Sequence, residues 1–333
     1  MKLRALCIGS GWGSHAARVF ASDARTELRG LVGRGSPRTR ALGRELGVPV
    51  FEDLPAAIAT TAPQISSVAA DEEANPKMVL ALLAAGSHVL CSHPVASTAE
   101  ATSALDVAAS SRGLNVATDY TLRLLPGFEA AAAATKADGP LLRLALESPG
   151  STSVMAIDIA AALAGPVEHV GAWARYPSEF ADRMLARPRA FAPTFVLEHA
   201  SGCVTTITPV PHADPAAAYR AVLSLECARV EMCLPSGGTS RLTYRGRGVV
   251  ERSQLIAAEL VSTPALTYGR AMSALVARFI STVLGGAPLH ADLREEAHVR
   301  AVWGGLTRSA RELRRVEIST PAVVIDQSRN RDS

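Results

Sequence analysis

The sequence predicts an α/β protein in which a doubly wound parallel sheet is followed by an α+β domain with an open, largely antiparallel sheet. Three observations predict this fold class. A glycine-rich turn at residues 9–13 separates an apolar run, residues 3–8, from a helix-compatible segment. Strand-like and helix-like segments then alternate as far as residue 120, which is typical of parallel sheets. Beyond residue 120, strand-like runs follow one another before helices return, which indicates a second domain.

The turn Gly9-Ser-Gly11-Trp12-Gly13-Ser14 predicts a dinucleotide-binding site. Gly9 suits a tight turn, and Gly11 lets the backbone approach a pyrophosphate. Gly13 and Ser14 keep the entry to the following helix small, and the free N–H groups of that helix favour an anion. We expect Trp12, inside the turn, to contact the cofactor as well.

The end of the second predicted strand, residues 27–34, bears on the choice of cofactor, because the adenosine ribose lies there in such sites. An NAD site usually places Asp or Glu at this point. This chain has Arg34, Ser36 and Arg38, and arginine suits a 2′-phosphate since it donates paired, charge-assisted hydrogen bonds. The pattern therefore predicts NADP(H). An alternative needs no ligand: Ser36 caps a helix that begins at Pro37.

The remaining elements of residues 1–120 complete a predicted Rossmann domain. The expected strands are residues 48–51, 65–70, 87–91 and 114–117. The expected helices are residues 54–60, capped by Asp53, residues 76–85, capped by Asn75 and ended by Gly86, and residues 97–111. Ligands lie beyond the carboxyl ends of parallel strands, so we expect site residues within residues 69–75, 91–95 and 118–123.

Residues 121–333 are predicted to form the substrate and dimerisation domain. Its expected strands are residues 141–147, 167–175, 194–199, 203–208 and 221–233, with a hairpin at Ser201-Gly202. Its expected helices are residues 153–164, 268–284 and 293–314, and the alanine run 130–134 also favours a helix. An open sheet leaves one broad face with apolar side chains of residues 204–207 and 222–225 uncovered, so we expect a homodimer.

Composition restricts the class of protein. The 333 residues are enough for two domains, and 48% of them are hydrophobic. A net charge of +3 and 5% aromatic residues give no basic, stacking surface for nucleic acid. We find no export segment and no apolar run of about 18 residues, so we expect a cytoplasmic protein without membrane contact. The five cysteines form no C-x-x-C pair and the eight histidines no H-x-x-x-H pair, so we expect no metal.

The chain resembles the Gfo/Idh/MocA oxidoreductases over nearly its whole length. The resemblance rests on the glycine turn, on residues 86–95, where that family usually has a Glu-Lys-Pro motif, and on residues 157–168. Two residues depart from the pattern. His93 occupies the place of the family's catalytic lysine, and Ala162 stands where sugar dehydrogenases commonly carry a histidine four residues after the aspartate, here Asp158.

These departures make the chain look like the thiazolinyl imine reductase branch of that family. The shared features are Gly35-Ser36-Pro37-Arg38, His93-Pro94, Thr118-Asp119-Tyr120 and Asp158 without a following histidine. The resemblance implies NADPH-dependent reduction of a cyclic C=N bond, a thiazoline to a thiazolidine, in siderophore or nonribosomal peptide biosynthesis. It also implies that a peptidyl carrier domain of a synthetase presents the substrate, that His93 and Pro94 lie at the cofactor, and that the chain pairs through its open sheet.

Reducing a C=N bond needs a proton for the nitrogen, and three residues are candidates for that chemistry. Tyr120 is the favoured donor because a phenol stays protonated at neutral pH. His93 assists or donates in its place, and Asp158 orients the donor. The alternatives are a solvent-exposed Tyr120, a hydrogen-bonded turn at His93 and a helix-capping Asp158. Two other functions stay open: an NADP-dependent dehydrogenase of a sugar-like alcohol, and a non-catalytic NADP-binding partner protein.

Overall fold

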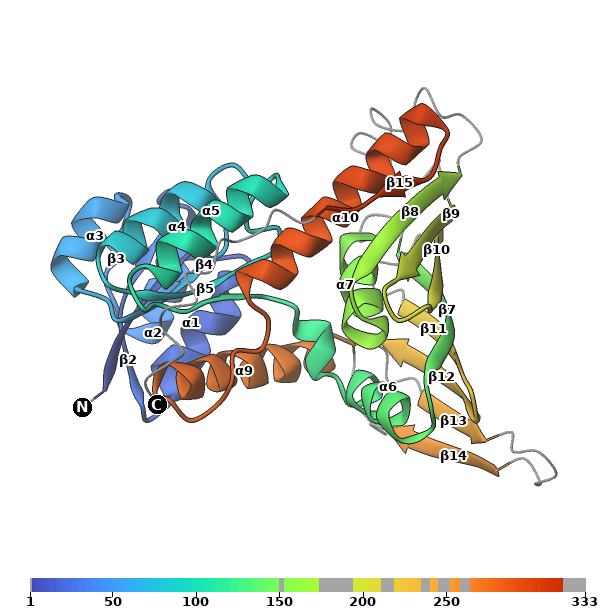
Figure 1. Cartoon of the computed structure of the whole chain (residues 1–333). Coiled ribbons are helices and arrows are strands. Elements are labelled where there is room, and N and C mark those ends of the chain that lie inside the picture. Colours follow the sequence, from blue (N-terminus) through green and yellow to red (C-terminus); the bar gives the residue numbers. More distant parts are fainter. Residues whose placement is uncertain are drawn as a thin grey trace, which may run out of the picture.

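The chain folds into two lobes, each built on one sheet, as the computed structural model shows (Figure 1). The residues described are 2–149, 153–173, 194–210, 219–234, 240–244, 252–257 and 264–319. One lobe has a six-stranded sheet and the other a nine-stranded sheet. The predicted fold class is confirmed.

The N-terminal sheet has the strand order β3-β2-β1-β4-β5-β6, and all of its pairs are parallel. Its strands are β1 (Leu3–Ile8), β2 (Thr26–Val32), β3 (Val50–Phe51), β4 (Ile65–Val68), β5 (His88–Cys91) and β6 (Val116–Thr118). The order reverses between β1 and β4. Doubly wound sheets bind their ligands in the crevice at such a switch point, so the carboxyl ends of β1 and β4 mark the expected site.

Helices cover both faces of this sheet, and the sequence explains where they begin. They are α1 (Gly13–Ser22), α2 (Pro37–Leu46), α3 (Leu54–Thr61), α4 (Asn75–Ala84) and α5 (Ala99–Ser110). The side chains of Ser36, Asp53 and Thr98 each accept a hydrogen bond from a backbone N–H of the first turn. The predicted cap Asn75 is wrong, since Asn75 is already helical and its side chain bonds elsewhere.

The second sheet has the order β14-β13-β12-β11-β7-β10-β9-β8-β15 and is antiparallel except for the pair of β7 and β10. Its strands are β7 (Leu141–Pro149), β8 (Val167–Trp173), β9 (Thr194–His199), β10 (Val204–Val210), β11 (Tyr219–Leu225), β12 (Ala228–Leu234), β13 (Ser240–Tyr244), β14 (Arg252–Ala257) and β15 (Val316–Glu317). The predicted strand 221–233 is in fact two strands, and β13, β14 and β15 were not predicted. Residues 174 and 175 of the predicted strand 167–175 lie outside the described residues.

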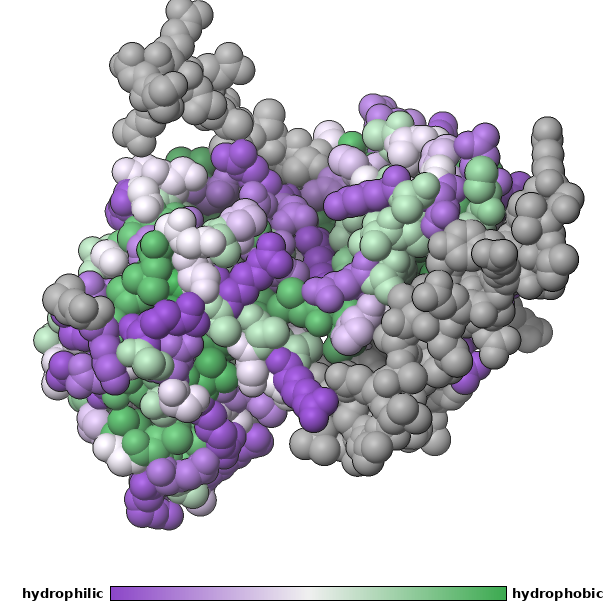
Figure 2. Space-filling view, turned by 90° about the horizontal axis from the view of Figure 1, so that it is seen from below, coloured by the Kyte–Doolittle hydropathy of each residue, from purple (hydrophilic) through white to green (hydrophobic). Residues whose placement is uncertain are grey.

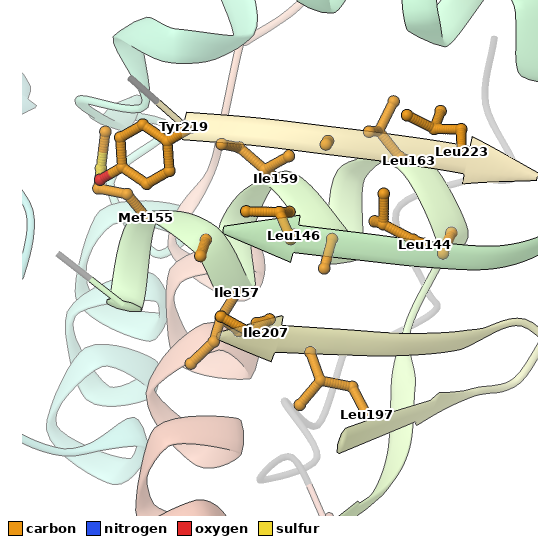
Figure 3. Packing of buried hydrophobic residues seen from close by; sticks show 14 of the residues in the cluster. Leu144, Leu146, Met155, Ile157, Ile159, Leu163, Leu197, Ile207, Tyr219 and Leu223 are labelled. Atoms are coloured by element: carbon orange, nitrogen blue, oxygen red, sulfur yellow. The ribbon is translucent and has the colours of Figure 1, made fainter. Parts of the chain in front are cut away.

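One face of the second sheet is covered by α6 (Pro126–Ala137), α7 (Ser153–Ala164) and part of α10 (Leu293–Glu312). A short 3-10 helix, η1 (Thr121–Leu124), leads from β6 into α6. Figure 3 shows the core between α7 and the strands, where Ile157 and Ile159 of α7 lie over Leu146 and Ile207 of the sheet. Burying these side chains contributes roughly 1.5–3 kcal/mol each to folding.

The other face of the second sheet carries no helix of the described chain (Figure 1). The expected apolar patch on it is smaller than predicted, because Ile207 and Leu223 are fully buried on the helix side. Val204 is 40% exposed on the open face, and Val222 is half-buried. The register places charged and small polar residues around them, for example Arg143 beside Val204.

Two helices of the second half of the chain return to the N-terminal domain. Helix α9 (Pro264–Val283) packs on α1, and its buried Leu275 and Phe279 join the core formed with Phe20. Helix α10 starts beside α5 and ends against β8, so it spans both lobes. The face seen in Figure 2 mixes hydrophilic and hydrophobic residues over the N-terminal lobe. Within the described residues we find no helix that combines the length and the apolar character needed to cross a membrane.

Candidate active site at the carboxyl edge of the parallel sheet

The glycine turn between β1 and α1 has the geometry that a dinucleotide needs. Gly9 has a φ of +93°, and a side chain there would collide with the carbonyl oxygen of Ala69. A Cβ atom on Gly11 would meet no atom of the described residues within 4 Å, so this is where the backbone lies open to a ligand. A Cβ atom on Gly13 would lie 3.0 Å from the carbonyl oxygen of Ile8, which explains a glycine at the start of α1. The turn therefore fits a pyrophosphate at the helix N-terminus.

Trp12 connects this turn to the far side of the crevice. Its indole N–H donates a hydrogen bond to Asp119, whose other carboxylate oxygen accepts one from Thr121. Burial raises the pKa of Asp119 to about 6, although both hydrogen bonds lower it. Trp12 and Asp119 line a cavity of about 20 Å³ together with Ser67 and Leu90, at the carboxyl ends of β1, β4 and β5. Trp12 thus lies at the switch point of the sheet.

The turn after β2 and the first turn of α2 carry all three residues predicted to bind a 2′-phosphate. Ser36 caps α2 by accepting a hydrogen bond of 3.2 Å from the N–H of Thr39, as the ligand-free alternative predicts. The guanidinium of Arg38 lies 3.4 Å from the carbonyl oxygen of Gly11, next to the glycine turn. Arg34 is exposed at the same turn. Capping uses one acceptor position of Ser36 and leaves both guanidinium groups accessible.

One carboxylate, which the sequence analysis missed, also lies at this turn. Glu52 follows β3, and its side chain occupies the space that a Cβ atom on Gly35 would need. The Glu52 carboxylate is 4.0 Å from the guanidinium of Arg40. A negative charge here opposes a 2′-phosphate, whereas the arginines favour it. Strand order alone does not reveal this neighbour, because Glu52 comes from the third strand and not the second.

The loop of residues 92–97 between β5 and α5 is held from several elements. The Asn75 side chain donates to the carbonyl oxygen of Pro94 at 3.0 Å and accepts from the N–H of Ala70 at 3.1 Å. The peptide bond between His93 and Pro94 is cis. On the other side, the N–H of Val95 donates to a carboxylate oxygen of Glu296 at 3.1 Å. The predicted segments 69–75 and 91–95 therefore do meet at one edge of the sheet.

His93 lies in this loop as a neutral side chain. Its ring stacks on that of Tyr120, with 5.6 Å between the centroids and 22° between the planes. Its Nδ1 atom is buried and has no hydrogen-bond partner among the described residues, so the alternative of a hydrogen-bonded turn is not formed through this nitrogen. Burial and the charge of Arg300 lower the pKa of His93 to about 4. At neutral pH His93 is therefore uncharged and is not an imidazolium donor.

Tyr120 is fully buried, and the alternative of a solvent-exposed phenol is wrong. Its hydroxyl donates a hydrogen bond to Glu296, and its backbone carbonyl lies 3.2 Å from Nε2 of His290. Burial and the charge of Glu296 raise the pKa of Tyr120, so the phenol is neutral, as predicted. Its proton, however, is directed to Glu296.

Asp158 lies in the middle of α7, so the alternative that it caps this helix is wrong. It is fully buried, and the Nε atom of Arg123 donates to its two oxygens at 3.1 and 3.2 Å. Arg123 also donates to Glu295 at 2.7 Å, and its guanidinium carbon lies 5.2 Å from the centre of the Tyr120 ring. Burial raises the pKa of Asp158, and Arg123 opposes that rise. Asp158 therefore orients Arg123 against the tyrosine.

Sequence reasoning missed the acidic and basic residues of α10 that complete this site. Glu296 is fully buried, and Arg300 donates to the carbonyl oxygen of Ser97 at 2.6 Å. One signal could have found them. Glu296 and Arg300 are four residues apart and fall on the same helical face as Leu293 and Ala297, which is the apolar face of the predicted helix. Charged residues at such positions indicate a buried polar network.

Comparison with known proteins identifies the N-terminal domain. Residues 3–120 match the family model GFO_IDH_MocA, described as an oxidoreductase family with an NAD-binding Rossmann fold. No curated protein matches the chain in sequence. Residues 3–120 are thus similar to the NAD-binding Rossmann domain of that oxidoreductase family.

Solved structures of similar fold cover almost the entire chain. An oxidoreductase from Agrobacterium radiobacter, in complex with NAD+, L-tartaric acid and magnesium, has a TM-score of 0.82 and 14% identity over 95% of this chain and 98% of its own. UDP-N-acetylglucosamine 3-dehydrogenase from Acidithiobacillus ferrooxidans has a TM-score of 0.75 and 18% identity over 93% and 99%. Levoglucosan dehydrogenase, in complex with NADH and L-sorbose, has a TM-score of 0.79 and 14% identity over 96% and 99%. At such low identity the likeness concerns the fold.

Among the residues described here, no group of three or more His, Cys, Asp or Glu side chains could hold a metal ion.

Proposed function

We propose that this chain, whose N-terminal domain is that of the Gfo/Idh/MocA oxidoreductases, is an NADP(H)-dependent enzyme that transfers a hydride to or from a small polar substrate. The carboxyl edge of the parallel sheet supports this proposal, because the glycine turn, the 92–97 loop and Tyr120 meet there. When bound, the nicotinamide cofactor supplies the hydride acceptor or donor.

The residues that would hold the cofactor follow from the open positions of the site. Gly9, Gly11 and Gly13 would hold the pyrophosphate at the start of α1, and Trp12 would adjoin it. Arg34, Ser36 and Arg38 would hold the 2′-phosphate, and His93 and Pro94 would lie towards the nicotinamide. Glu52 places a carboxylate against Gly35 of the same turn, and its charge would weaken the preference for NADP over NAD.

Dehydrogenation of a sugar-like alcohol is the reaction that the described geometry supports best. The observation that carries it is the place of His93, which corresponds to the family's lysine and lies in the 92–97 loop against Tyr120, with an Nδ1 atom that no described residue bonds. Oxidising an alcohol requires a base that takes the hydroxyl proton as the hydride leaves, and a neutral imidazole is such a base. Asp158 and Arg123 hold the Tyr120 ring beside this imidazole.

Reduction of a carrier-tethered thiazoline is the second candidate. The absence of a lysine at residue 93, together with Gly35-Ser36-Pro37-Arg38, His93-Pro94 and Thr118-Asp119-Tyr120, favours it. This reaction needs a proton donor at neutral pH. In the structure the Tyr120 hydroxyl is bonded to Glu296 and His93 is neutral, so water would have to supply the proton. A peptidyl carrier domain would be the partner in this case.

One pair of assays separates the two candidates. The dehydrogenase predicts reduction of NADP+ with at least one member of a panel of sugars and polyols, and no oxidation of NADPH with a thiazoline thioester. The imine reductase predicts the reverse pattern. Turnover of neither substrate class, with NADPH bound at micromolar concentration, would favour a non-catalytic NADP-binding protein.

We also propose that the chain is a homodimer that pairs through the open face of the nine-stranded sheet. That face carries the exposed Val204, the half-buried Val222 and, beside them in register, charged side chains such as Arg143. Replacing Val204 by Glu adds charge to this face and is expected to shift the protein towards the monomer of 34.8 kDa. Light scattering of the parent at micromolar concentration that gave the monomer mass would contradict this proposal.

A further inference from the structure

A buried carboxylate at the start of α10 lies behind the proposed site. Asp292 caps this helix and forms a capping box with Glu295, which explains two acidic residues at the helix start. Neither the cap nor the macrodipole accounts for the next residue, Glu296, because its side chain is fully buried. A buried carboxylate is costly unless hydrogen bonds compensate the loss of water.

Glu296 has two hydrogen-bond donors, and they belong to different elements of the site. One carboxylate oxygen accepts from the N–H of Val95 at 3.1 Å, within the loop that carries His93. The other oxygen accepts from the hydroxyl of Tyr120, at the end of β6. A single side chain therefore ties together two segments that come from neighbouring strands of the parallel sheet.

These two segments also touch through their rings. His93 stacks on Tyr120, and the Arg123 guanidinium also lies over the ring of this fully buried tyrosine. Fixing the tyrosine hydroxyl fixes the direction of the Cβ–Oη axis of Tyr120 and therefore the position of the ring on which His93 stacks. Fixing Val95 N–H holds the backbone two residues after His93.

We propose that Glu296 is a positioning residue: it sets the orientation of the His93 imidazole through the Tyr120 ring and the backbone of the 92–97 loop. The catalytic consequence of this role rests on the proposed function, whereas the structural consequence does not. Arg300, one turn further along α10, holds the same loop at the carbonyl oxygen of Ser97. Helix α10 starts beside α5 and ends against β8 of the nine-stranded sheet. Through Glu296 and Arg300, the position of His93 therefore depends on how α10 packs on both lobes.

The first test compares Glu296→Gln with Glu296→Ala. A glutamine keeps an oxygen for the N–H of Val95 and offers an NH₂ group to the Tyr120 oxygen, so it preserves the geometry without the charge. We expect kcat of Glu296→Gln to stay within about fivefold of the parent, and kcat of Glu296→Ala to fall about ten- to a hundredfold with an unchanged Kd for NADPH. The matched control is Glu312→Ala on the same helix, where the carboxylate pairs with Arg314 at the surface. An equal loss in both Glu296 variants would overturn the proposal in favour of a role for the charge itself.

The second test needs no substrate. NMR titration of the imidazole, with His93→Gln to assign the resonance, gives the pKa of His93 in each variant. The pKa is expected near 4 in the parent and in Glu296→Gln, and closer to 6.5 in Glu296→Ala, since a released ring gains water. An unchanged pKa in a folded Glu296→Ala protein would overturn the proposal. If the parent turns over no substrate of either class, the proposed function fails, and this titration still decides the role of Glu296.

Discussion

Two loops at the same edge of the parallel sheet differ in how they are held. The turn after β2, which carries Arg34 and Arg38, is exposed, and its arginine side chains make few contacts with the protein. The 92–97 loop after β5 is bonded by Asn75 of α4 and by Glu296 and Arg300 of α10. Both loops follow parallel strands, so the fold alone does not cause the difference.

The difference matches two demands of a hydride-transfer enzyme. Cofactor selection needs accessible charges, which gain their partner only when a phosphate arrives. The reacting groups need fixed geometry before the substrate arrives, because a displacement of about 1 Å costs about a hundredfold in rate. The two loops therefore make separable predictions: changes in the first should alter cofactor affinity, and changes in the second should alter turnover.

The largest effect is expected from His93→Ala. Loss of general acid–base catalysis lowers kcat by about a hundred- to ten-thousandfold, whereas the Kd for NADPH should change little. The measurement is kcat with the best substrate of the panel, next to NADPH titration by fluorescence. His169→Ala, on β8 in the second lobe, serves as the control for removal of a histidine. A kcat of His93→Ala within threefold of the parent would show that the 92–97 loop does not supply a catalytic side chain.

A smaller effect, on the affinity for NADPH and not on kcat, is expected from Arg38→Ala. Loss of a charge-assisted contact with the 2′-phosphate should weaken NADPH binding about ten- to a hundredfold and leave NADH binding unchanged. Arg44→Ala, in the last turn of the same helix, removes an arginine away from the turn. Equal affinities of the unmodified protein for NADPH and NADH would reject the assignment of this turn to NADP.

Glu52→Gln changes the charge of the same turn and is expected to strengthen NADPH binding, the opposite of Arg38→Ala. Removing a repulsive charge at an exposed position is worth about 0.2–1 kcal/mol, so NADPH affinity should rise by up to about fivefold. NADH, which lacks the 2′-phosphate, should bind as before. Titrations at low and high salt check the cause, because screening should abolish the gain. A weaker affinity for NADPH in this variant would mean that Glu52 binds the ribose rather than opposing the phosphate.

The last prediction concerns stability and not activity. The pKa of His93 is lowered from 6.5 to about 4 by burial and by Arg300, so between these values the unfolded chain binds a proton that the folded chain does not. The neutral His93 therefore contributes its full stabilisation to the free energy of unfolding above pH 6.5, and this stabilisation is lost as the pH falls towards 4. The Tm of the parent should therefore fall relative to that of His93→Gln between pH 7 and pH 5. Asp119, with a pKa raised to about 6, acts in the opposite sense but equally in both proteins. A constant Tm difference would contradict a buried, neutral His93.

The sequence predicted those elements whose signals are local. The order of strand, glycine turn and helix at Gly9, and the cap at Ser36, follow from neighbouring residues and are confirmed. Strand β13 was missed because only two apolar residues, Leu242 and Tyr244, alternate in its five residues, and β14 was missed because its sequence lacks an apolar alternation. The cap assigned to Asn75 is wrong for a similar reason: the side chain prefers the backbone of the 92–97 loop, which lies far away in sequence.

The site was predictable only in part. The strand ends direct attention to His93 and Tyr120, and those rings do stack. Their chemical state depends on Glu296 and Arg300, which come from a helix about 175–200 residues later, and on burial that residue types alone do not reveal. The roles assigned to Tyr120 and Asp158 therefore stay predictions, and the role of His93 is a prediction that His93→Ala tests.

Helix α9 has a practical consequence for anyone who wishes to study the cofactor domain alone. A fragment that ends at residue 120 keeps all six parallel strands but loses the helix that buries Leu275, Phe279 and Ile280 against α1. Loss of α9 would expose a hydrophobic patch on α1, and the fragment is expected to aggregate or to require detergent. Joining residues 264–283 to that fragment through a flexible linker should restore its solubility.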